Sequence, residues 1–315
     1  MGNNIEDNFE FIIIGAGAAG LSAAQYASRA NIKTLVIDQG LPGGQATSIS
    51  TLENYPGVFP PVSGPAWIES MKNQAESFGA KIIQAQVSKA QRTDGGFSVE
   101  TSRGIFSSDT MLIATGAEHR KLAIPGETEL SGRGVSYCAT CDGPFFRNKS
   151  VVVVGGGDSA CDEATYLSTI CSSVTVVHRK SQFRAQKSVA ARVLSNPKIT
   201  VRFNAQLTQI LGEKKVSSVE LTDTITGEKS TLETSAVFIF VGMIPRTGLF
   251  SEITLDEAGY IKTSEDMETS VPGLFAAGDV RSKSFRQIVT ACSDGAIAAN
   301  TAAKFLREKN NEVYK

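Results

Sequence analysis

A run of strand, glycine-rich turn, helix and strand occurs twice in this chain of 315 residues, and it constrains the fold more than any other feature. Residues 11–20 read FIIIGAGAAG and residues 151–160 read VVVVGGGDSA, and a helical stretch and a β-branched run follow each. The interval from the first glycine to the end of that run is the same in both copies, from Gly15 to Asp38 and from Gly155 to His178. Matched units of this kind predict parallel strands joined by crossover helices. We therefore predict an α/β protein with two Rossmann-like dinucleotide-binding domains.

The segments between these units alternate in polarity. Residues 96–109 and 218–232 alternate in the way that predicts β-hairpins, which would add a second β layer to each domain. A core-facing helix is expected from Asp294 to Leu306, a packing role is expected for Trp67, and a loop position is expected for His119. Together these elements predict two domains of the three-layer ββα type.

The glycines of the two turns have a physical role that suits a dinucleotide. Gly15 lets the strand turn into the helix, Gly17 lets the backbone approach a pyrophosphate, and Gly20 lets the helix pack close to the strand. The pyrophosphate then lies at the helix N-terminus, where free N–H groups favour anions. Glycines that serve packing alone are the alternative, which the doubled strand–turn–helix context disfavours. The second turn repeats the arrangement with Gly155, Gly157 and Ala160.

The residue that ends the second strand distinguishes the two sites. Asp38 can accept hydrogen bonds from a ribose diol, and its charge would repel a 2′-phosphate. The second copy instead offers a basic cluster that suits the 2′-phosphate of NADP(H), although a solvated basic patch is the alternative. The cluster consists of His178, Arg179, Lys180 and Arg184. We therefore predict that the chain binds FAD at the first site and NADPH at the second.

A CxxC pair, Cys138 and Cys141, is followed directly by Asp142. Two cysteines at this spacing can form a reversible disulfide, and a neighbouring carboxyl can relay protons as the disulfide opens and closes. The alternatives are half of a zinc site, which one CxxC pair and two histidines do not complete, and two core cysteines. We predict no metal site and a redox role: hydride to flavin, flavin to disulfide, dithiol to a partner. Core packing is expected for Cys161, Cys171 and Cys292.

Composition limits the remaining function classes. The net charge of −1 argues against a dedicated nucleic-acid binder. No apolar run approaches the ~18 residues that a membrane-spanning helix needs, and the polar, acidic N-terminus is unlike a signal or transit peptide. An odd number of cysteines without a secretion signal indicates a reducing compartment.

Several motifs follow one another as in the low-molecular-weight thioredoxin reductases, and the chain resembles this family over nearly its entire length. The motifs are LPGGQ, TLENYPG, ATGA, VSYCATCDGPFF, HRKSQFR, AAGDV and FRQIVTA. The resemblance implies a homodimeric cytoplasmic flavoenzyme that carries FAD, oxidises NADPH and reduces the disulfide of thioredoxin. It also implies an FAD domain of residues 1–117 and 247–315, with an NADPH domain of residues 118–246 inserted into it.

The resemblance assigns roles to particular residues. Cys141 would receive electrons from the flavin, Cys138 would attack the disulfide of thioredoxin, and Asp142 would protonate the outgoing thiolate. Asp279 would hold the ribityl hydroxyls of FAD. Other contacts to FAD are expected at Ala18, Gln39, Gly43, Gly44, Gln45, Asn54, Val87, Ala114, Thr115, Gly116, Gly278, Arg286, Gln287 and Ile288. Other contacts to NADPH are expected at Asp158, Ser159 and Gly242.

The chain departs from the family pattern at three positions. Two alternative functions are also considered. Lys180 stands where arginine is usual, which predicts weaker discrimination against NADH. Arg246 replaces an asparagine, and Cys292 replaces a small residue. The alternative enzyme is a reductase of another dithiol carrier, of the alkyl hydroperoxide reductase type, which could accept NADH. A flavin-bound scaffold without activity is the alternative from another class, and it predicts no effect of replacing Cys138.

Overall fold

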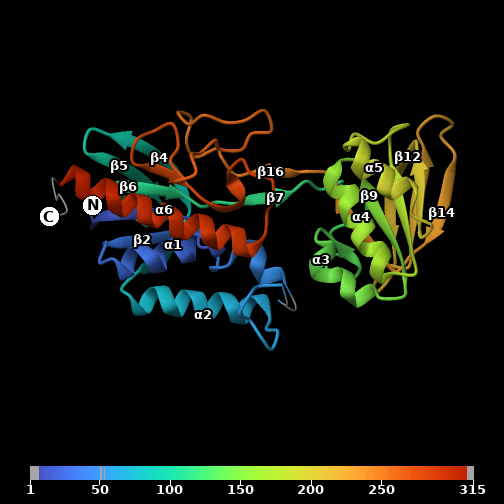
Figure 1. Ribbon diagram of the computed structural model, residues 1–315, viewed down its shortest axis with the longest axis horizontal. Coiled ribbons are helices and arrows are strands. Elements are labelled where there is room, and N and C mark those ends of the chain that lie inside the picture. Colours follow the sequence, from blue (N-terminus) through green and yellow to red (C-terminus); the bar gives the residue numbers. More distant parts are fainter. Residues whose placement is uncertain (1–6, 50–51, 53, 311–315) are drawn as a thin grey trace. The chain divides into compact units, whose positions relative to one another are not determined.

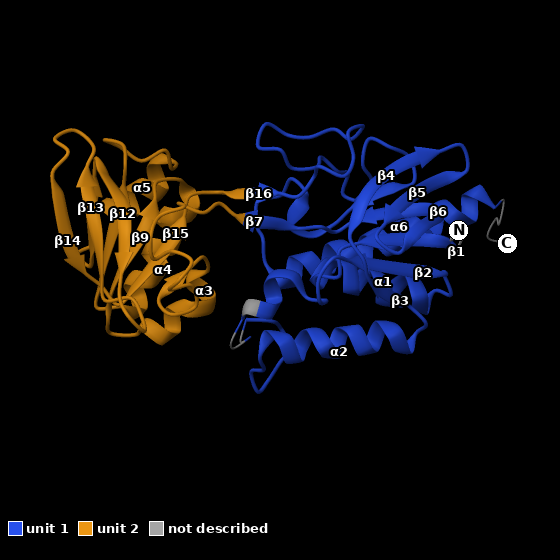
Figure 2. Cartoon of the chain, turned by 180° about the vertical axis from the view of Figure 1, so that it is seen from behind, with its two compact units in different colours: residues 1–118, 244–315 blue, residues 119–243 orange. Residues whose placement is uncertain are grey.

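The computed structural model describes residues 7–49, 52 and 54–310. The chain forms two compact units, Met1–Glu118 with Ile244–Lys315 (unit 1) and His119–Met243 (unit 2), which Figure 2 distinguishes by colour. The chain passes between the units in two short strands that pair with each other, β7 (Ala117–His119) and β16 (Met243–Pro245). Each unit has its own sheet and its own core.

Unit 1 is built on a seven-stranded sheet. Its strands are β1 (Asp7–Ile14), β2 (Thr34–Asp38), β3 (Lys81–Gln84), β4 (Val87–Thr93), β5 (Gly96–Thr101), β6 (Gly104–Ile113) and β17 (Leu274–Ala276). They lie in the order β3-β2-β1-β6-β5-β4, with β17 also on β6. The pairs among β3, β2, β1, β6 and β17 are parallel, whereas β4, β5 and β6 pair antiparallel. Strand β1 lies where the crossovers change direction, which is where open α/β sheets bind ligands.

Both faces of this sheet are buried. On one face, Phe11, Ile13 and Leu112 pack with α1 (Ala18–Arg29), α2 (Gly64–Ser77) and α6 (Ile288–Lys309), which Figure 1 shows in blue, cyan and red. On the other face, Ile12 and Ile14 pack against residues of the β4–β5 hairpin and of the segment 250–280. The continuous apolar run of β1 is therefore buried on both sides, as parallel strands require.

Unit 2 repeats the plan. Its parallel sheet has the order β11-β10-β9-β15-β8, and a three-stranded antiparallel sheet, β12-β13-β14, covers one face. The parallel strands are β8 (Val135–Ser136), β9 (Ser150–Gly155), β10 (Ser173–His178), β11 (Ile199–Phe203) and β15 (Ala236–Phe240). The antiparallel strands are β12 (Ala205–Leu211), β13 (Ser218–Asp223) and β14 (Lys229–Glu233). The helices of this unit are α3 (Ala139–Asp142), α4 (Asp158–Ile170) and α5 (Lys187–Leu194). Helices α4 and α5 pack on the other face of the parallel sheet. Strand β9 thus occupies the place that β1 has in unit 1.

The predicted α/β fold class is confirmed, as are both hairpins and the packing role of Trp67, which is buried. Two local predictions were wrong. Helix α6 begins at Ile288 rather than Asp294, because Gln287 caps it and exchanges hydrogen bonds with Thr290 in a capping box. His119 lies in β7 rather than in a loop, and its ring stacks on Tyr137.

Candidate functional site

The first glycine-rich turn has the geometry that the sequence predicted. Gly15 has φ +107°, and a Cβ there would overlap the carbonyl group of Ala114. A Cβ on Gly20 would overlap the carbonyl oxygen of Gly15, so the helix can approach the strand this closely only with glycine. Gly17, in contrast, has open space around its Cβ position to 4 Å among the described residues. Two of these glycines are needed by the fold, and the third leaves room for a ligand.

Asp38 ends β2 directly beside this turn. Its Oδ2 accepts the N–H of Ala16 at 2.7 Å, and its Oδ1 accepts the N–H of Gly40 at 2.9 Å. The two hydrogen bonds fix the carboxylate and leave lone pairs for further donors. The Gly43–Gly44 loop is held nearby, since the N–H of Gly43 donates to the carbonyl of Ala16 at 2.8 Å. The structure thus brings together the Asp38 carboxylate, which was predicted to bind a ribose, the glycine turn and the Gly43–Gly44 loop.

A buried charge network surrounds Asp279. Its Oδ1 is buried without a hydrogen-bond partner among the described residues and lies 3.4 Å from Nζ of Lys283. Burial raises the pKa of Asp279, and the Lys283 ammonium opposes that shift. Lys283 also binds Asp294, which accepts hydrogen bonds from Arg281 and from the N–H of Gly278, each at 3.0 Å. This network holds the short helix η3 (Gly278–Val280) against α6, and a Cβ on Gly278 would lie 2.9 Å from the Cβ of Ala19 in α1.

Arg286 lies close to this network. Its guanidinium is 4.0 Å from the ring centre of Tyr260, and its Nε is buried without a partner in the described part of the chain. Gln287 follows, and its Oε1 accepts a hydrogen bond from Nδ2 of Asn54 at 3.3 Å. Asp279 and Arg286 therefore each present a buried polar atom that has no hydrogen-bond partner among the described residues and is available to a ligand.

The remaining residues predicted at the first site are more widely placed. Gln45 donates from Nε2 to the carbonyl of Ala117, and Thr115 donates its hydroxyl to the carbonyl of Arg246 at 2.6 Å. Gln39 is exposed, and Val87 begins β4 and packs against the core cluster of Ile12 and Ile14. The contacts of Gln39 and Val87 do not join them to the glycine turn. Ala18, Ala114, Gly116 and Ile288 lie at the ends of α1, β6 and α6.

The second turn, in unit 2, has the same geometry. Gly155 has φ +153°, and a Cβ there would overlap the carbonyl oxygen of Phe240. The ring of His178 fills the space beside Gly156, where a Cβ would overlap it. Gly157 caps α4 and has open space to 4 Å around its Cβ position within the described chain, as Gly17 has. This turn also leaves room for a ligand.

The basic cluster is tied to this turn by backbone hydrogen bonds. The N–H of Arg184 donates to the carbonyl of Gly156 at 2.7 Å, and the N–H of Gln186 donates to Oδ1 of Asp158 at 2.8 Å. Arg179, Lys180 and Arg184 are exposed. Ser159 and Ala160 lie in the first turn of α4, and Gly242 follows β15 with φ +112°.

His178 differs from the other members of the cluster. Its side chain is buried beside the rings of Phe183 and Phe203. Burial lowers its pKa, and the nearby cations lower it further. The imidazole is therefore neutral, and the positive charge of the cluster comes from the arginines and the lysine.

Cys138 and Cys141 form a disulfide, with their Cα atoms 5.3 Å apart. Cys138 caps the short helix α3, so the N–H of Cys141 donates to Sγ of Cys138 at 3.2 Å, and the Thr140 hydroxyl lies 3.4 Å from that sulfur. Asp142 ends this helix, and burial raises the pKa of its carboxyl. Its Oδ2 accepts the hydroxyl of Ser136 at 2.6 Å. The disulfide thus lies beside a carboxyl whose pKa is raised by burial.

The other described cysteines pack in the core, as predicted. Cys161, Cys171 and Cys292 are free and buried, and burial raises the pKa of Cys161 and of Cys292 to about 11. These thiols stay protonated near neutral pH and are poor nucleophiles.

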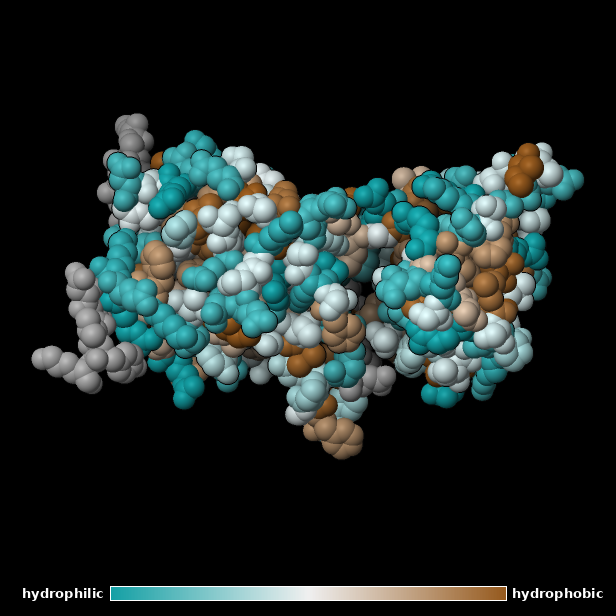
Figure 3. Space-filling view, turned by 45° about the horizontal axis from the view of Figure 1, so that its top comes forward, coloured by the Kyte–Doolittle hydropathy of each residue, from teal (hydrophilic) through white to brown (hydrophobic). Residues whose placement is uncertain are grey.

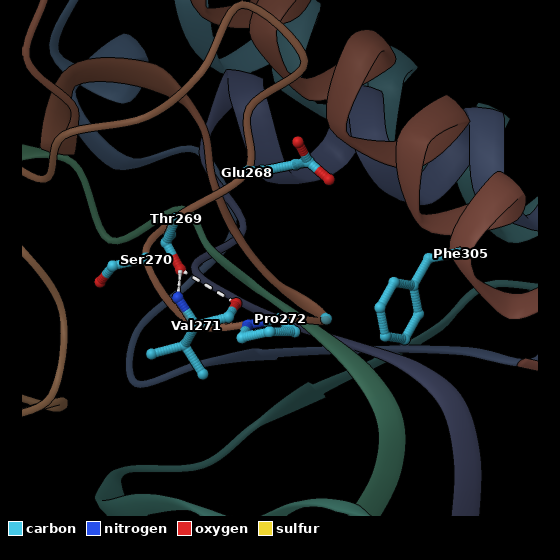
Figure 4. Close-up of a pocket in the computed structure, with 7 residues that line it drawn as sticks. Glu268, Thr269, Ser270, Val271, Pro272 and Phe305 are labelled. Carbon is cyan, nitrogen blue, oxygen red and sulfur yellow. Dashed lines mark hydrogen bonds between the residues drawn. The ribbon is translucent and has the colours of Figure 1, made fainter.

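Other features of the described residues carry no further site. No group of three or more metal-ligating side chains is present among them, and no helix in the described ranges is long and apolar enough to cross a membrane. On the face drawn in Figure 3, hydrophilic residues cover most of the surface, with hydrophobic ones in small groups between them. A hollow of about 200 Å³ beside Phe305 and residues 268–273 (Figure 4) contains none of the predicted site residues.

Two dinucleotide-type turns and a CxxC disulfide beside a carboxyl define the class of protein: an oxidoreductase that couples a nucleotide cofactor to a disulfide. Residues 9–295 match the pyridine nucleotide-disulphide oxidoreductase family, and the chain belongs to it. The predicted family is thereby confirmed.

Known relatives agree over almost the whole chain. A thioredoxin reductase of Treponema pallidum (strain Nichols) is 55% identical over 307 residues, which are 98% of this chain and 100% of that protein. A thioredoxin reductase of Bacillus subtilis (strain 168) is 46% identical over 305 residues, which are 96% of each chain. The crystal structure of thioredoxin reductase from Streptococcus pyogenes MGAS5005 matches with a TM-score of 0.87 and 43% identity, over 96% of this chain and 99% of that one.

Sequence reasoning missed several residues of these sites. Ser136, which contacts Asp142, lies within the motif VSYCATCDGPFF but outside the CxxC pair, and it was assigned no role. Lys283 and Asp294 complete the network around Asp279 from separate segments. Only the two-residue spacing of Ser136 from Cys138 could have drawn attention to any of these three.

Proposed function

We propose that this protein is an NADPH-dependent thioredoxin reductase, with FAD in unit 1, NADPH in unit 2 and the Cys138–Cys141 disulfide as the electron carrier to thioredoxin. The observation that carries the proposal is this disulfide, with Asp142 beside it, in a chain that has two dinucleotide turns. Full-length relatives named thioredoxin reductase support the choice of partner.

The residues of unit 1 fit FAD. The open space at Gly17 accommodates a pyrophosphate, and the fixed carboxylate of Asp38 suits an adenosine ribose. The orphaned Oδ1 of Asp279 is an acceptor for ribityl hydroxyls, and the orphaned Nε of Arg286 is a donor. When bound, NADPH supplies a hydride to FAD, and the flavin passes two electrons to the disulfide.

The residues of unit 2 fit NADPH. Gly157 leaves space for its pyrophosphate, and the exposed cations that follow β10 suit its 2′-phosphate. Hydrogen bonds from Arg184 and Gln186 hold this cationic segment to the turn. Lys180 supplies charge without the planar fork of arginine, so NADH should be excluded less strictly than in relatives with arginine there.

Replacing both Arg179 and Arg184 by alanine is expected to raise the KM for NADPH on the order of 10- to 100-fold, because charge-assisted hydrogen bonds to the 2′-phosphate are lost. The KM for NADH should stay within about threefold, since NADH lacks that phosphate. Steady-state kinetics with both nucleotides measures the two effects. Arg192→Ala is the matched control, because Arg192 is an exposed arginine of the same unit that pairs with Asp162 at 2.8 Å. Equal effects on the two nucleotides would argue against a 2′-phosphate site.

The reduced cysteines then perform disulfide exchange. The N–H of Cys141 and the Thr140 hydroxyl stabilise a thiolate at Cys138. This thiolate attacks one sulfur of thioredoxin's disulfide, a mixed disulfide forms, and Asp142 gives a proton to the sulfur that leaves. The sulfur of Cys141 next attacks Cys138, which restores the Cys138–Cys141 disulfide, and the proton of the Cys141 thiol passes to the second sulfur of thioredoxin as that sulfur leaves. Two electrons and two protons pass to thioredoxin, so the exchange balances.

The assembly and location belong to the same proposal. We infer a homodimer from the resemblance to the family, and a cytoplasmic location from the resemblance and the buried free thiols, which suit a reducing compartment. We propose an FAD domain of residues 1–117 and 247–315 and an inserted NADPH domain of residues 118–246, whose bounds differ by one to three residues from those of units 1 and 2.

The direct test is steady-state reduction of purified thioredoxins by the protein with NADPH, compared with reduction of the dithiol carrier of an alkyl hydroperoxide reductase system. We expect kcat/KM for a thioredoxin to be at least about tenfold above that for the other carrier. A tenfold difference requires only about 1.4 kcal/mol of additional transition-state binding. Faster reduction of the other carrier would identify that carrier, and not thioredoxin, as the partner. Flavin reduction without reduction of any dithiol carrier would favour the scaffold without activity.

A further inference from the structure

Ser136 places a buried hydroxyl between the acid and the cysteine pair. It ends β8, it is 4% exposed, and its Oγ lies 2.6 Å from Oδ2 of Asp142. The same Oγ accepts the N–H of Cys138 at 3.1 Å and lies 3.2 Å from the carbonyl oxygen of Cys138. One side chain that the CxxC motif does not include therefore contacts both the carboxyl and the backbone of the attacking cysteine.

These contacts satisfy Ser136 in either protonation state of Asp142. A hydroxyl has one proton to donate and two lone pairs. When Asp142 is ionised, Ser136 donates to its Oδ2 and accepts from the N–H of Cys138. When Asp142 is protonated, the carboxyl can donate to Oγ of Ser136, and the Ser136 proton turns to the carbonyl of Cys138. The Ser136 hydroxyl thus has both a donor contact and an acceptor contact in either state, so the acid can gain and lose its proton without a change in the position of the Ser136 side chain.

We propose that Ser136 is the positioning residue for Asp142: its hydroxyl holds the carboxyl in place through both protonation states and joins it to the backbone of Cys138. The inference rests on the proposed function, in which Asp142 protonates the leaving sulfur. Ser136 contacts no reacting sulfur atom and acts through Asp142.

The surroundings of Asp142 predict how loss of the Ser136 hydroxyl changes the pKa of the Asp142 carboxyl. Burial raises the pKa of Asp142, and the hydrogen bond from Ser136 lowers it. Of the elements packed against α3, η2 (Gly143–Phe146) has no titratable side chain, and α4 carries the titratable groups. These groups are Asp158, Cys161, Asp162, Glu163 and Tyr166. In the reduced enzyme the thiols of Cys138 and Cys141, at the start of α3 and within it, are titratable as well. The two shifts on Asp142 come from burial and Ser136, so removal of the hydroxyl leaves the raising effect unopposed.

The test is Ser136→Ala, measured by single-turnover reduction of thioredoxin by the prereduced holoenzyme between about pH 4 and about pH 10, a range that runs from the reference pKa of an aspartate to beyond that of a thiol. The protonated form of Asp142 is the active one, so its titration makes the rate fall as the pH rises, whereas ionisation of the Cys138 thiol to the attacking thiolate makes the rate rise. A higher pKa therefore moves this fall to higher pH, and loss of positioning lowers the plateau about tenfold. Ser136→Thr keeps a hydroxyl and should restore the position of the fall.

Two further variants make the result specific. Ser168→Ala is the matched control, because Ser168 is also 4% exposed, lies in the same unit, and both donates to the carbonyl of Thr165 and accepts from Nδ2 of Asn196. It should leave the pH profile unchanged. Asp142→Asn should remove the fall altogether, and adding Ser136→Ala to it should have no further effect on the profile.

The outcomes separate this inference from the proposed function. A lower plateau in Ser136→Ala with the fall at its original pH would mean that Ser136 has a purely structural role, and would overturn the inference. If Asp142→Asn leaves the rate and its pH dependence intact, the assigned role of Asp142 itself is wrong. Flavin reduction by NADPH serves as the folding control, and it should proceed at the original rate in every variant.

Discussion

Replacing Cys141 by serine is expected to lower the reduction of thioredoxin by a factor on the order of 10⁴ or more, while NADPH still reduces the bound flavin. A serine hydroxyl cannot form the disulfide that accepts electrons and later releases the partner. In the proposed function, both cofactors are bound by the glycine turns and the charged residues described above, which the substitution leaves in place. Stopped-flow absorbance measures flavin reduction, and the NADPH-coupled assay measures thioredoxin reduction.

Two controls support the interpretation. Cys138→Ser should abolish turnover equally, yet leave Cys141 as a thiol that alkylating agents can titrate. Cys171→Ala is the matched control, because Cys171 is a buried free cysteine of the same unit whose pKa burial raises. It should keep turnover within about twofold of the original, since a buried protonated thiol takes no part in exchange. Unchanged thioredoxin reduction by Cys141→Ser would contradict the role that the mechanism gives to Cys141.

The glycine turns could be predicted from sequence because their geometry is local. The chain must turn sharply at Gly15 and bring the helix close at Gly20, and only glycine permits the contacts with Ala114 and Gly15 that the structure shows. The same spacing in the second copy led to the same prediction. Local steric demands of this kind leave a signature within ten residues.

The polar networks could not be predicted, because they join residues through the tertiary fold. Asp294 lies 16 residues from Gly278, whose N–H it accepts, and nothing in the intervening sequence signals that contact. The run His178-Arg179-Lys180 predicts three cations, but Phe203 from the neighbouring strand and Phe183 bury the imidazole. Burial, rather than residue type, decides which of the three carries charge.

Changing Gly17 or Gly157 to valine is expected to remove one cofactor at a time. Both glycines have extended backbones that any residue can adopt, with φ −75° and ψ −174° at Gly17 and φ −96° and ψ 179° at Gly157. Among the described residues outside the neighbouring positions, nothing lies within 4 Å of either Cβ position, so the fold has room for a Cβ there and a larger side chain takes up the space that we assign to the pyrophosphate. Gly17→Val should yield folded protein without flavin. Gly157→Val should yield flavin-bound protein whose KM for NADPH rises on the order of 100-fold or more, since the backbone can no longer approach the pyrophosphate.

Absorbance spectra, thermal unfolding and NADPH titrations distinguish these outcomes. Gly20→Ala is the contrasting variant, because its Cβ would overlap the carbonyl oxygen of Gly15; it should lose stability and flavin together. Gly157→Val that has been reduced chemically should still reduce thioredoxin in a single turnover, because the dithiol and Asp142 are intact. That result would separate nucleotide binding from disulfide exchange within unit 2. Normal NADPH kinetics in Gly157→Val, or normal flavin content in Gly17→Val, would show that the turn in question does not hold the pyrophosphate.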